Sequence, residues 1–176
     1  MNEVIRAIAE RSSTRQYTQE KLTQEELSTL IHAGLQAPTA ANRQEIHITV
    51  VDGGHPILAE IEREMRAGSD RQWPQTSFYF DAPTVMILSA DTKFSWGPID
   101  AGIAVENIAL AAEGLGLGSV IIGCIKKAMT GEKQADFAER LKFPRDYAFE
   151  VAIAVGHKAA SKTPHEYSFE KNVTIL

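Results

Sequence analysis

The sequence is poor in cysteine: its 176 residues include one, Cys124. A single cysteine cannot close an intramolecular disulfide or build a cysteine-rich metal site, and its position in an apolar run predicts a buried, unreactive thiol. The five histidines lack the HxxxH and HExxH spacings of metal sites, so we expect no bound metal. These shortages favour a protein of a reducing compartment that needs no covalent or metallic cross-link.

Long hydrophobic runs and clusters of positive charge are also missing. No apolar run approaches the ~18 residues of a membrane-spanning helix, and the first residues, MNEVIRAIAERSS, carry too many charges for a secretion signal. A formal net charge of -5 without a Lys/Arg cluster argues against nucleic acid as a partner, because neutralising phosphates requires a basic face. We therefore expect a cytoplasmic protein that binds neither membranes nor nucleic acids.

The chain does contain a series of apolar patterns that fits one domain, long enough to bury about two thirds of its unfolded surface. The sequence TQEE, which starts at Thr23, matches a helix capping box. Because two helical patterns precede the first strand, an α+β fold with a mixed sheet fits at least as well as a doubly wound fold. The expected helices cover residues 2–11, 23–35, 55–68, 98–113 and 132–141, and the expected strands cover residues 47–52, 83–91, 119–125 and 149–156. The run at 83–91 is apolar throughout, which predicts a central strand.

Residues 114–123, GLGLGSVIIG, raise the question of a nucleotide-binding loop. A dinucleotide fingerprint follows a strand and opens a helix, which holds the phosphate at its N-terminus. Here the helical run comes first and the strand follows, and Ile121 stands where the fingerprint requires its third glycine. The glycines are therefore interpreted as the end of a helix that leads into a strand.

Two polar segments could hold a ligand. In the first, Arg11 and Arg15 enclose three hydroxyl side chains and could bind a phosphorylated molecule, although a solvated helix end has the same composition. In the second, APTAANRQ, the amides of Asn42 and Gln44 could pair with the edge of a heterocycle or cap a turn.

The sequence offers no obvious catalytic side chain. Ser119 precedes a strand and lacks the GxSxG elbow of a hydrolase nucleophile. Anion and amide donors without an acid, a base or a nucleophile are the pattern expected when a cofactor carries the chemistry.

Four segments, in the same order along the chain, resemble the FMN-dependent nitroreductase family. They are RSSTRQY near the N-terminus, APTAANRQ before the first strand, DAGIAVENIALAAEGLGLGS with VIIG after it, and AIAVGHK near the end. The resemblance implies a single FMN-binding domain over residues 1–176, with a nitroreductase-like α+β sandwich fold in which helices flank a mixed central sheet. It also implies a homodimer with two FMN sites at the subunit interface. Residues 163–176 would form a C-terminal arm that embraces the partner and can add a strand to its sheet.

The same resemblance assigns the contacts of FMN and gives no side chain a catalytic role, because FMN carries the chemistry. The residues expected at the phosphate, the ribityl chain and the N1/O2 side of the ring are Arg11, Ser12, Ser13 and Arg15. Those expected to approach the flavin from the other subunit are Pro38, Thr39, Ala40 and Asn42, with Gln44 close by. Those whose backbone amides would face N5 and O4 of the ring are Ile122 and Gly123.

The chain departs from the family pattern near its C-terminus. The family usually carries a Lys and an Arg there for the FMN phosphate, and a gapless reading from Gly156 places His165 and Tyr167 at these positions. Phosphate binding would then rest on Arg11 and His165, with Lys162 as a further candidate. The affinity for FMN would depend on pH if His165 takes part.

A second departure follows the loop glutamine, where Glu45-Ile46 replaces the Pro-Trp found in many family members. The segment 68–80 matches no family motif. The irregular run RQWPQTSFYFDAP, residues 71–83, contains an aromatic cluster that could cover a pocket.

The implied activity is that of an NAD(P)H-dependent FMN oxidoreductase with a ping-pong mechanism. A nicotinamide would reduce FMN and leave, and an electron-poor acceptor such as a nitroaromatic, a quinone or a free flavin would take its place. One alternative is reductive dehalogenation or flavin fragmentation, for which the usual extra lid is missing because segment 68–80 is short. Another is a flavin-binding module that stores or senses FMN without turnover.

Overall fold

A computed structural model describes residues 2–68, 72–73 and 75–176 of the chain. In this part, seven α-helices, one 3-10 helix and four strands follow one another. Their bounds are α1 (Glu3–Glu10), α2 (Gln24–Leu35), the 3-10 helix η1 (Ala40–Asn42), β1 (Ile46–Asp52), α3 (Pro56–Ala67), β2 (Thr84–Asp91), α4 (Gly97–Gly114), β3 (Leu117–Ile122), α5 (Lys126–Met129), α6 (Gln134–Arg140), β4 (Tyr147–His157) and α7 (Phe169–Asn172).

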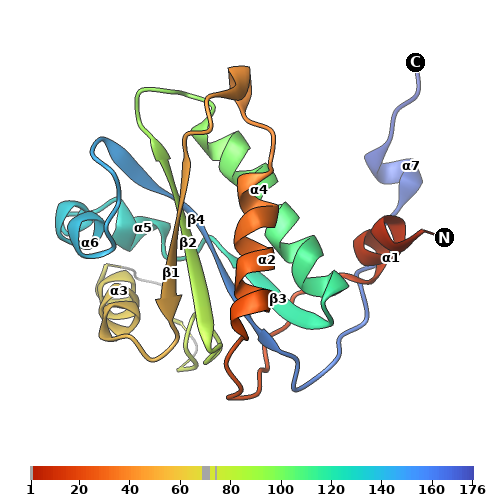
Figure 1. Cartoon of the computed structure of the whole chain (residues 1–176), viewed down its shortest axis with the longest axis horizontal. Coiled ribbons are helices and arrows are strands. Elements are labelled where there is room, and N and C mark those ends of the chain that lie inside the picture. Colours follow the sequence, from red (N-terminus) through yellow and green to blue (C-terminus); the bar gives the residue numbers. More distant parts are fainter. Residues whose placement is uncertain (1, 69–71, 74) are drawn as a thin grey trace.

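The four strands form one sheet in the order β1-β2-β4-β3 (Figure 1), and each neighbouring pair is antiparallel. Strand β2 is interior to the sheet, as its largely apolar sequence predicts, because burial on both faces favours apolar side chains. Thr84 and Ser89 are its buried polar residues. The sequence predicted a mixed sheet. In the described chain, the parallel pairing is one isolated bridge between Ser13 and Ser119. The α+β class is confirmed.

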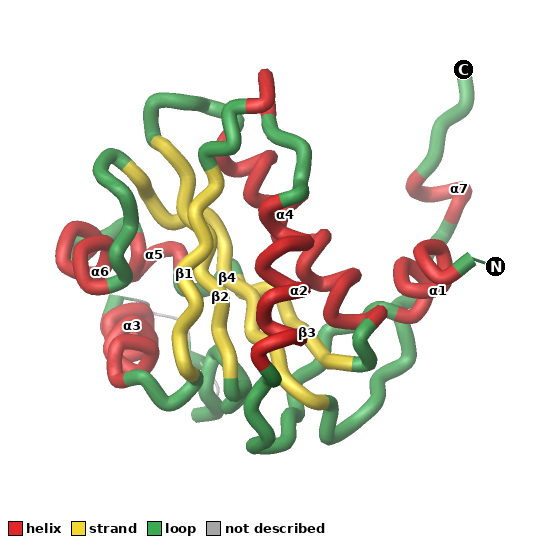
Figure 2. Tube along the Cα trace, in the orientation of Figure 1, coloured by secondary structure: helices red, strands yellow, loops and turns green. Residues whose placement is uncertain are grey.

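Helices cover both faces of the sheet, which gives three layers (Figure 2). Helices α2 and α4 pack on one face, where Leu30, Ile108 and Met86 form part of a buried cluster. Helices α3, α5 and α6 cover the other face, where Ile61, Ile87 and other buried side chains form a second cluster. Alternate residues of β2 point to opposite faces, so this strand contributes to both.

Local sequence signals fix several element ends. The Thr23 hydroxyl accepts from the Glu26 amide at 3.2 Å, and the Glu26 carboxylate accepts from the Thr23 amide at 2.7 Å, so the predicted capping box is present at the start of α2. Helix α4 ends at Gly114, and Gly116 adopts a φ of 75°, which glycine tolerates far better than other residues. The turn then leads directly into β3, as expected.

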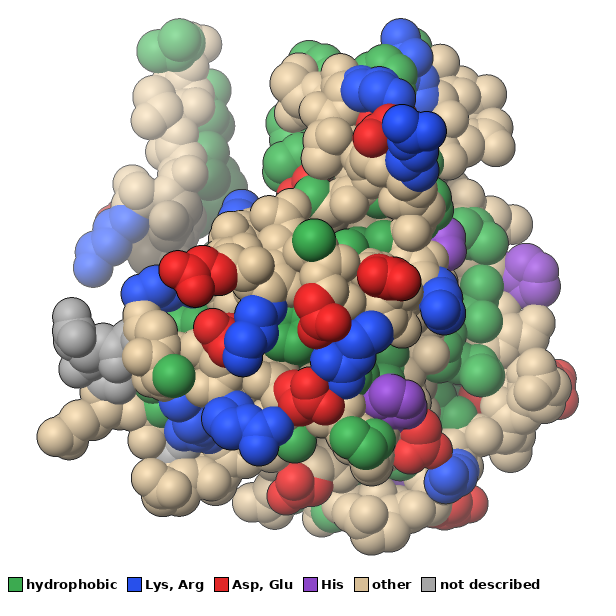
Figure 3. All heavy atoms as spheres, turned by 90° about the vertical axis from the view of Figure 1, so that its left-hand side faces the viewer, with side chains coloured by type: hydrophobic (Ala, Val, Ile, Leu, Met, Phe, Trp, Pro, Cys, Tyr) green, Lys and Arg blue, Asp and Glu red, His purple; other side chains and the backbone are tan. Residues whose placement is uncertain are grey.

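The surface differs from side to side. The side formed by α3, α5 and α6 carries acidic and basic side chains in alternation (Figure 3), including the ion pairs of Arg140 with Glu60 and of Lys133 with Glu64. On α1 and α4, by contrast, apolar side chains are exposed, and Ile5 and Ile99 have 50% and 54% of their surface accessible. In the described part of the chain, none of the helices has the length and apolar character needed to cross a membrane.

The last residues of the chain extend away from the three layers. Beyond Lys162 the chain runs past α1, and α7 stands apart from the sheet (Figure 1). The same separation is visible from the side (Figure 3). Tyr167, Phe169 and Ile175 in this segment are exposed.

Candidate functional site

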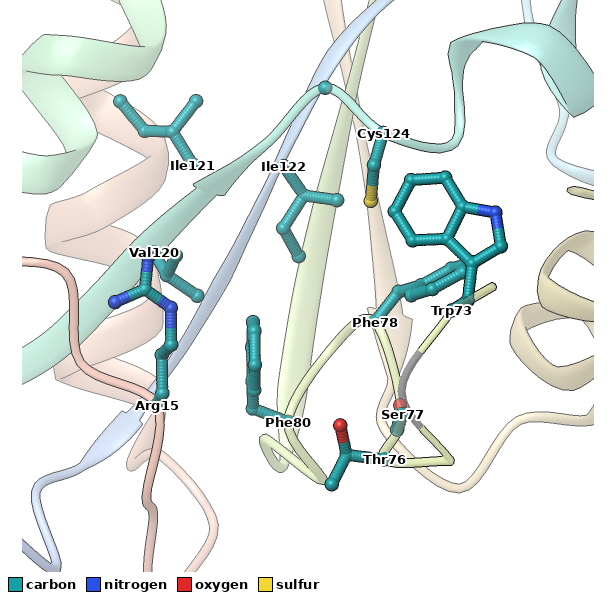
Figure 4. Close-up of a pocket in the computed structure, with 11 residues that line it drawn as sticks. Arg15, Trp73, Thr76, Ser77, Phe78, Phe80, Val120, Ile121, Ile122 and Cys124 are labelled. Carbon is teal, nitrogen blue, oxygen red and sulfur yellow. The ribbon is translucent and has the colours of Figure 1, made fainter. Parts of the chain in front are cut away.

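A pocket of about 260 Å³ opens between the N-terminal segment, the end of β3 and the loop that precedes β2 (Figure 4). Arg15 lies on one side of it, and Val120 to Cys124 form its floor and rim. The opposite side consists mainly of aromatic and hydroxyl side chains, which are Trp73, Thr76, Ser77, Phe78 and Phe80.

Backbone pairing with β3 brings Arg15 to this pocket. The Thr14 amide donates to the Ser119 carbonyl at 2.9 Å, next to the bridge between Ser13 and Ser119. The buried Tyr17 hydroxyl donates to the Thr14 carbonyl at 2.8 Å, and burial raises the pKa of this phenol, so it stays a donor. The segment is therefore held on both sides of Arg15.

The Arg15 side chain is exposed and forms no salt bridge with a carboxylate of the described chain. Its guanidinium lies 5.7 Å from the centroid of the Phe80 ring. An arginine without a carboxylate partner at the mouth of an apolar pocket can attract an anionic or strongly polar ligand edge.

Two glycines near the pocket have different roles. A Cβ at Gly118 would lie 2.6 to 2.8 Å from the side chain of Thr14, so this glycine permits the close approach of the N-terminal segment to β3. A Cβ at Gly123 would meet no atom of the described residues within 4 Å, and its φ is not in the left-handed region. Neither packing nor backbone conformation within the chain thus requires a glycine at 123, where the main chain is left open towards the pocket.

The aromatic side of the pocket is anchored to α3. The Glu62 carboxylate accepts from the Ser77 hydroxyl at 2.6 Å and from the Phe78 amide at 2.5 Å. Arg66, one turn further along α3, donates to the Thr76 carbonyl at 2.9 Å and has its guanidinium 4.4 Å from the Phe78 ring centroid. These contacts keep the loop against the helix.

Phe80 and Asp81 hold an unusual backbone conformation next to the pocket, with φ of 55° and 54°. Residues other than glycine adopt this left-handed region at a cost of about 1 kcal/mol or more each. The contacts to α3 supply the compensation that keeps the Phe80 ring beside Arg15.

Cys124 is half-buried and lines the pocket, so the expectation of a fully buried thiol is wrong. The sequence signal for this side of the pocket was the aromatic composition of segment 71–83, of which residues 71 and 74 lie outside the described residues. It gave no indication that Phe80 faces Arg15, because that contact depends on the turn at Phe80 and Asp81.

The second group of expected flavin contacts lies elsewhere in the chain. The loop that begins at Pro38 follows the C-terminal end of α2, at the top of Figure 1, whereas the N-terminal end of α2 and the Arg15 segment lie at the bottom. The Thr39 hydroxyl accepts from the Gln44 amide at 2.9 Å, and the Gln44 side chain donates to Asn42 at 3.2 Å. Within one chain, this loop and the Arg15 pocket do not meet.

Of the residues expected at the phosphate, Ser12 lines another hollow, while Arg11 and Ser13 are not among the described residues that line it. The Ser12 hydroxyl donates to the Lys162 carbonyl at 3.0 Å, at the edge of a cavity of about 260 Å³ that Lys158 and Lys162 also line. Arg11 lies 3.6 Å from Glu106 of α4. His165 is exposed just beyond Pro164, which lines the same cavity.

Comparison with known proteins identifies the family and the fold. A model described as the nitroreductase family matches residues 8–157. The chain belongs to the nitroreductase family. Among relatives, the FMN reductase (NAD(P)H) of Bacillus subtilis (strain 168) is 31% identical over 182 residues, which cover 90% of this chain and 67% of the relative. The NADPH-flavin oxidoreductase of Vibrio harveyi is 28% identical over 167 residues, which cover 89% and 66% of the two chains.

Solved nitroreductase structures resemble the whole chain. The nitroreductase with bound FMN from Desulfitobacterium hafniense superposes with a TM-score of 0.88 at 31% identity, covering 100% of this chain and 99% of that one. The nitroreductase with bound FMN from Bacteroides fragilis gives a TM-score of 0.88 at 27% identity and covers both chains completely. The nitroreductase α+β fold expected from the sequence is confirmed.

The anchoring of the pocket wall in this nitroreductase can be tested at Glu62. Glu62→Ala should lower the free energy of unfolding by about 2 kcal/mol, because the Ser77 and Phe78 donors lose a charged acceptor. Urea unfolding measures this change, and the exposed Glu132→Ala serves as the control. An unchanged midpoint for Glu62→Ala would show that the loop is held by other contacts.

Proposed function

We infer that this chain is an FMN-dependent oxidoreductase that takes its reducing equivalents from NADH or NADPH. The observation that carries this inference is its agreement, over the full length of the chain, with nitroreductase structures that hold FMN. The names of its relatives, an FMN reductase and an NADPH-flavin oxidoreductase, agree with it. FMN is therefore the cofactor.

The pocket at the end of β3 fits the ring of FMN. A flat heterocycle needs apolar surface along its faces and polar donors at its edge. Ile122 and Phe80 supply apolar surface, Arg15 supplies a cation without a carboxylate partner in the described chain, and Gly123 leaves the main chain uncovered. The fit supports the assignment of these residues as flavin contacts.

When bound, FMN supplies hydride chemistry, because N5 accepts a hydride from a nicotinamide and passes it to an electron-poor acceptor such as a nitroaromatic, a quinone or a free flavin. The Arg15 guanidinium would bind the N1/O2 side of the ring and favour negative charge there. The backbone amides of Ile122 and Gly123 would face N5 and O4, and orient the ring. No side chain needs to act as a nucleophile.

The phosphate and ribityl contacts are assigned to the segment before Arg15. Arg11 supplies a guanidinium, and Ser12 and Ser13 supply hydroxyls; Ser12 lines the cavity that Lys162 also lines. His165 lies where the chain leaves this cavity, so it is a candidate second cation for the phosphate. Glu106 competes for Arg11, because the two side chains are 3.6 Å apart.

The assembled state is proposed to be a homodimer in the cytoplasm, with each FMN held by two subunits. The loop with Pro38, Thr39, Ala40, Asn42 and Gln44 is separated from the Arg15 pocket in its own chain, so it would have to serve the partner's flavin. Exposed apolar side chains on α1 and α4, including Ile5 and Ile99, supply surface for the contact.

The arm at residues 163–176 would complete the dimer. Strand β1 lies at the edge of the sheet, and its outer backbone groups have no described strand beside them. The arm ends in VTIL, whose first residue, Val173, has an extended backbone. An extended apolar segment and a free sheet edge fit strand addition between subunits.

A spectroscopic experiment tests the activity. The purified protein should be yellow, lose its flavin absorbance on anaerobic addition of NADH or NADPH, and regain it on addition of a nitroaromatic. Stopped-flow absorbance with each nucleotide measures the reaction and identifies the preferred donor. Bound flavin that resists both nucleotides would contradict the proposal and favour a protein that stores or senses FMN.

A further inference from the structure

Glu45 and Asp100 bring two carboxyl groups together inside the protein. Glu45 lies between the Pro38 loop and β1, and Asp100 lies in the first turn of α4. Only 4% of Glu45 and 3% of Asp100 is accessible to solvent. Their side chains lie within hydrogen-bonding reach of each other. A buried acidic pair of this kind has no part in the flavin contacts described above.

The two carboxyl groups have different partners. Oδ2 of Asp100 accepts from the Ala40 amide at 2.9 Å, which ties the loop to α4. Apart from the contact with the backbone amide of Glu45 itself, neither Oε1 nor Oε2 of Glu45 receives a hydrogen bond from a donor of the described chain. The nearby guanidinium of Arg43 instead lies 3.8 Å from the centroid of the Phe94 ring.

Two ionised carboxylates cannot form a hydrogen bond with each other, because both are acceptors and their charges repel in the low-dielectric interior. One proton between them removes the repulsion and gives Glu45 a donor function toward Asp100. Such a proton leaves the other oxygen of Asp100 free to hold the Ala40 amide.

We propose that Glu45 and Asp100 share one proton, and that this proton holds the loop Thr39–Gln44 in the conformation that contacts FMN across the subunit boundary. Glu45 is then a positioning residue, which acts through Asp100 and the Ala40 amide. The part of the proposal that concerns FMN rests on the proposed function. The shared proton and its effect on the loop do not.

The loop needs such support because its backbone is costly. Ala41, Asn42 and Gln44 have φ values of 54°, 52° and 55°, in the left-handed region. Each of these conformations costs about 1 kcal/mol or more for a residue other than glycine, although asparagine tolerates it better. The bonds of the Ala40 amide to Asp100 and of the Gln44 amide to Thr39 oppose this strain.

The surroundings of Glu45 favour the protonated form. Burial raises the pKa of the Glu45 carboxyl and Asp100 raises it further, while the backbone amide of Glu45 itself and Arg43 act in the opposite direction. Tyr147 of β4 also faces this carboxyl, and Asp91 faces Tyr147. Lys93 lines the same cavity as Glu45, but its ammonium group is 2.7 Å from Asp146. Arg43 and Lys93 are thus engaged by other groups, and neither forms a salt bridge with Glu45 or Asp100 in the described chain.

The direction of the pH effect follows from the raised pKa. The folded loop retains the proton that an unfolded chain would have released, so the stabilisation is complete below the ordinary glutamate pKa. It is lost as the pH rises through the raised pKa of Glu45. The loop should be held firmly at low pH and loosened at high pH.

Glu45→Gln tests the proposal, because an amide donates to Asp100 at every pH. The FMN dissociation constant, measured by quenching of flavin fluorescence from about pH 5 to about pH 9, should rise more steeply for the wild type than for the variant. The ratio of the two dissociation constants should approach a change of about tenfold per pH unit above the raised pKa of Glu45. Titration of the FMN phosphate affects both proteins equally and cancels in the ratio. The exposed Glu139→Gln should keep the wild-type slope.

Amide hydrogen exchange at Ala40 provides a readout without FMN. After correction for the intrinsic rate, protection should fall with rising pH in the wild type and stay constant in Glu45→Gln. Asp100→Asn should also remove the pH dependence, and it keeps the proposal testable if Glu45→Gln fails to fold. Equal pH dependence of protection in the wild type and the folded variants would overturn the shared proton. Failure of the wild type to bind FMN at any pH would instead contradict the proposed function.

Discussion

Removal of residues 163–176 should yield a monomer, or an aggregate, that no longer retains FMN. The arm exposes 84% of Tyr167, 62% of Phe169 and 83% of Ile175 in the isolated chain. Burying each such side chain against a partner contributes about 2 kcal/mol, so loss of the arm removes a large part of the association energy. Analytical ultracentrifugation with detection at the flavin absorbance measures assembly and cofactor together.

The truncated chain should keep its own fold, because the contact between Ser12 and the Lys162 carbonyl remains. Circular dichroism with an unchanged helix signal would therefore separate loss of assembly from unfolding. A truncated protein that remains an FMN-loaded dimer would rule out the embracing arm.

Arg15→Ala should weaken FMN binding by about 10-fold to 100-fold, because a charge-assisted hydrogen bond contributes about 1.5 to 3 kcal/mol. The effect on folding should be small, since the Arg15 side chain is exposed and the neighbouring backbone is held through Thr14 and Tyr17. Equilibrium dialysis against FMN gives the dissociation constant.

Arg63→Ala is a suitable control for Arg15→Ala, because Arg63 is an exposed arginine on α3. It should retain FMN as the wild type does. Equal retention in both variants would remove Arg15 from the flavin site.

The parts of the fold that the sequence predicted depend on local patterns. The capping box at Thr23 needs only residues three positions apart, and the run that became β2 shows its burial in composition alone. Helices α5 and α7 were not predicted, because an element of four residues is too short to display a helical period. The turn that ends α4 was predicted correctly because it depends on the backbone conformation of one local glycine, Gly116.

The candidate site was less accessible to prediction, because it is assembled by contacts between distant segments. Arg15 was predicted to bind flavin from its motif, but its position beside Phe80 depends on the pairing of Ser13 with Ser119 and on the Glu62 anchor. These contacts leave no pattern in a single sequence.

Glu45 shows the same limit for a charged residue. Glutamate in a loop predicts exposure to solvent. Glu45 is nevertheless buried, near Asp100 of α4, and the two residues are too far apart in the sequence for any local pattern to predict this.

The position of β1 has a consequence for how the protein must be made. A folded protomer that has not yet formed the proposed dimer exposes the backbone of an edge strand as well as apolar helix surface, and both promote irregular association. Newly synthesised chains would therefore face two competing processes on the same surfaces: pairing, which joins two chains, and aggregation, which joins many and rises more steeply with concentration. Slow synthesis at low temperature keeps the concentration of unpaired protomers low, so it should increase the yield of paired protein.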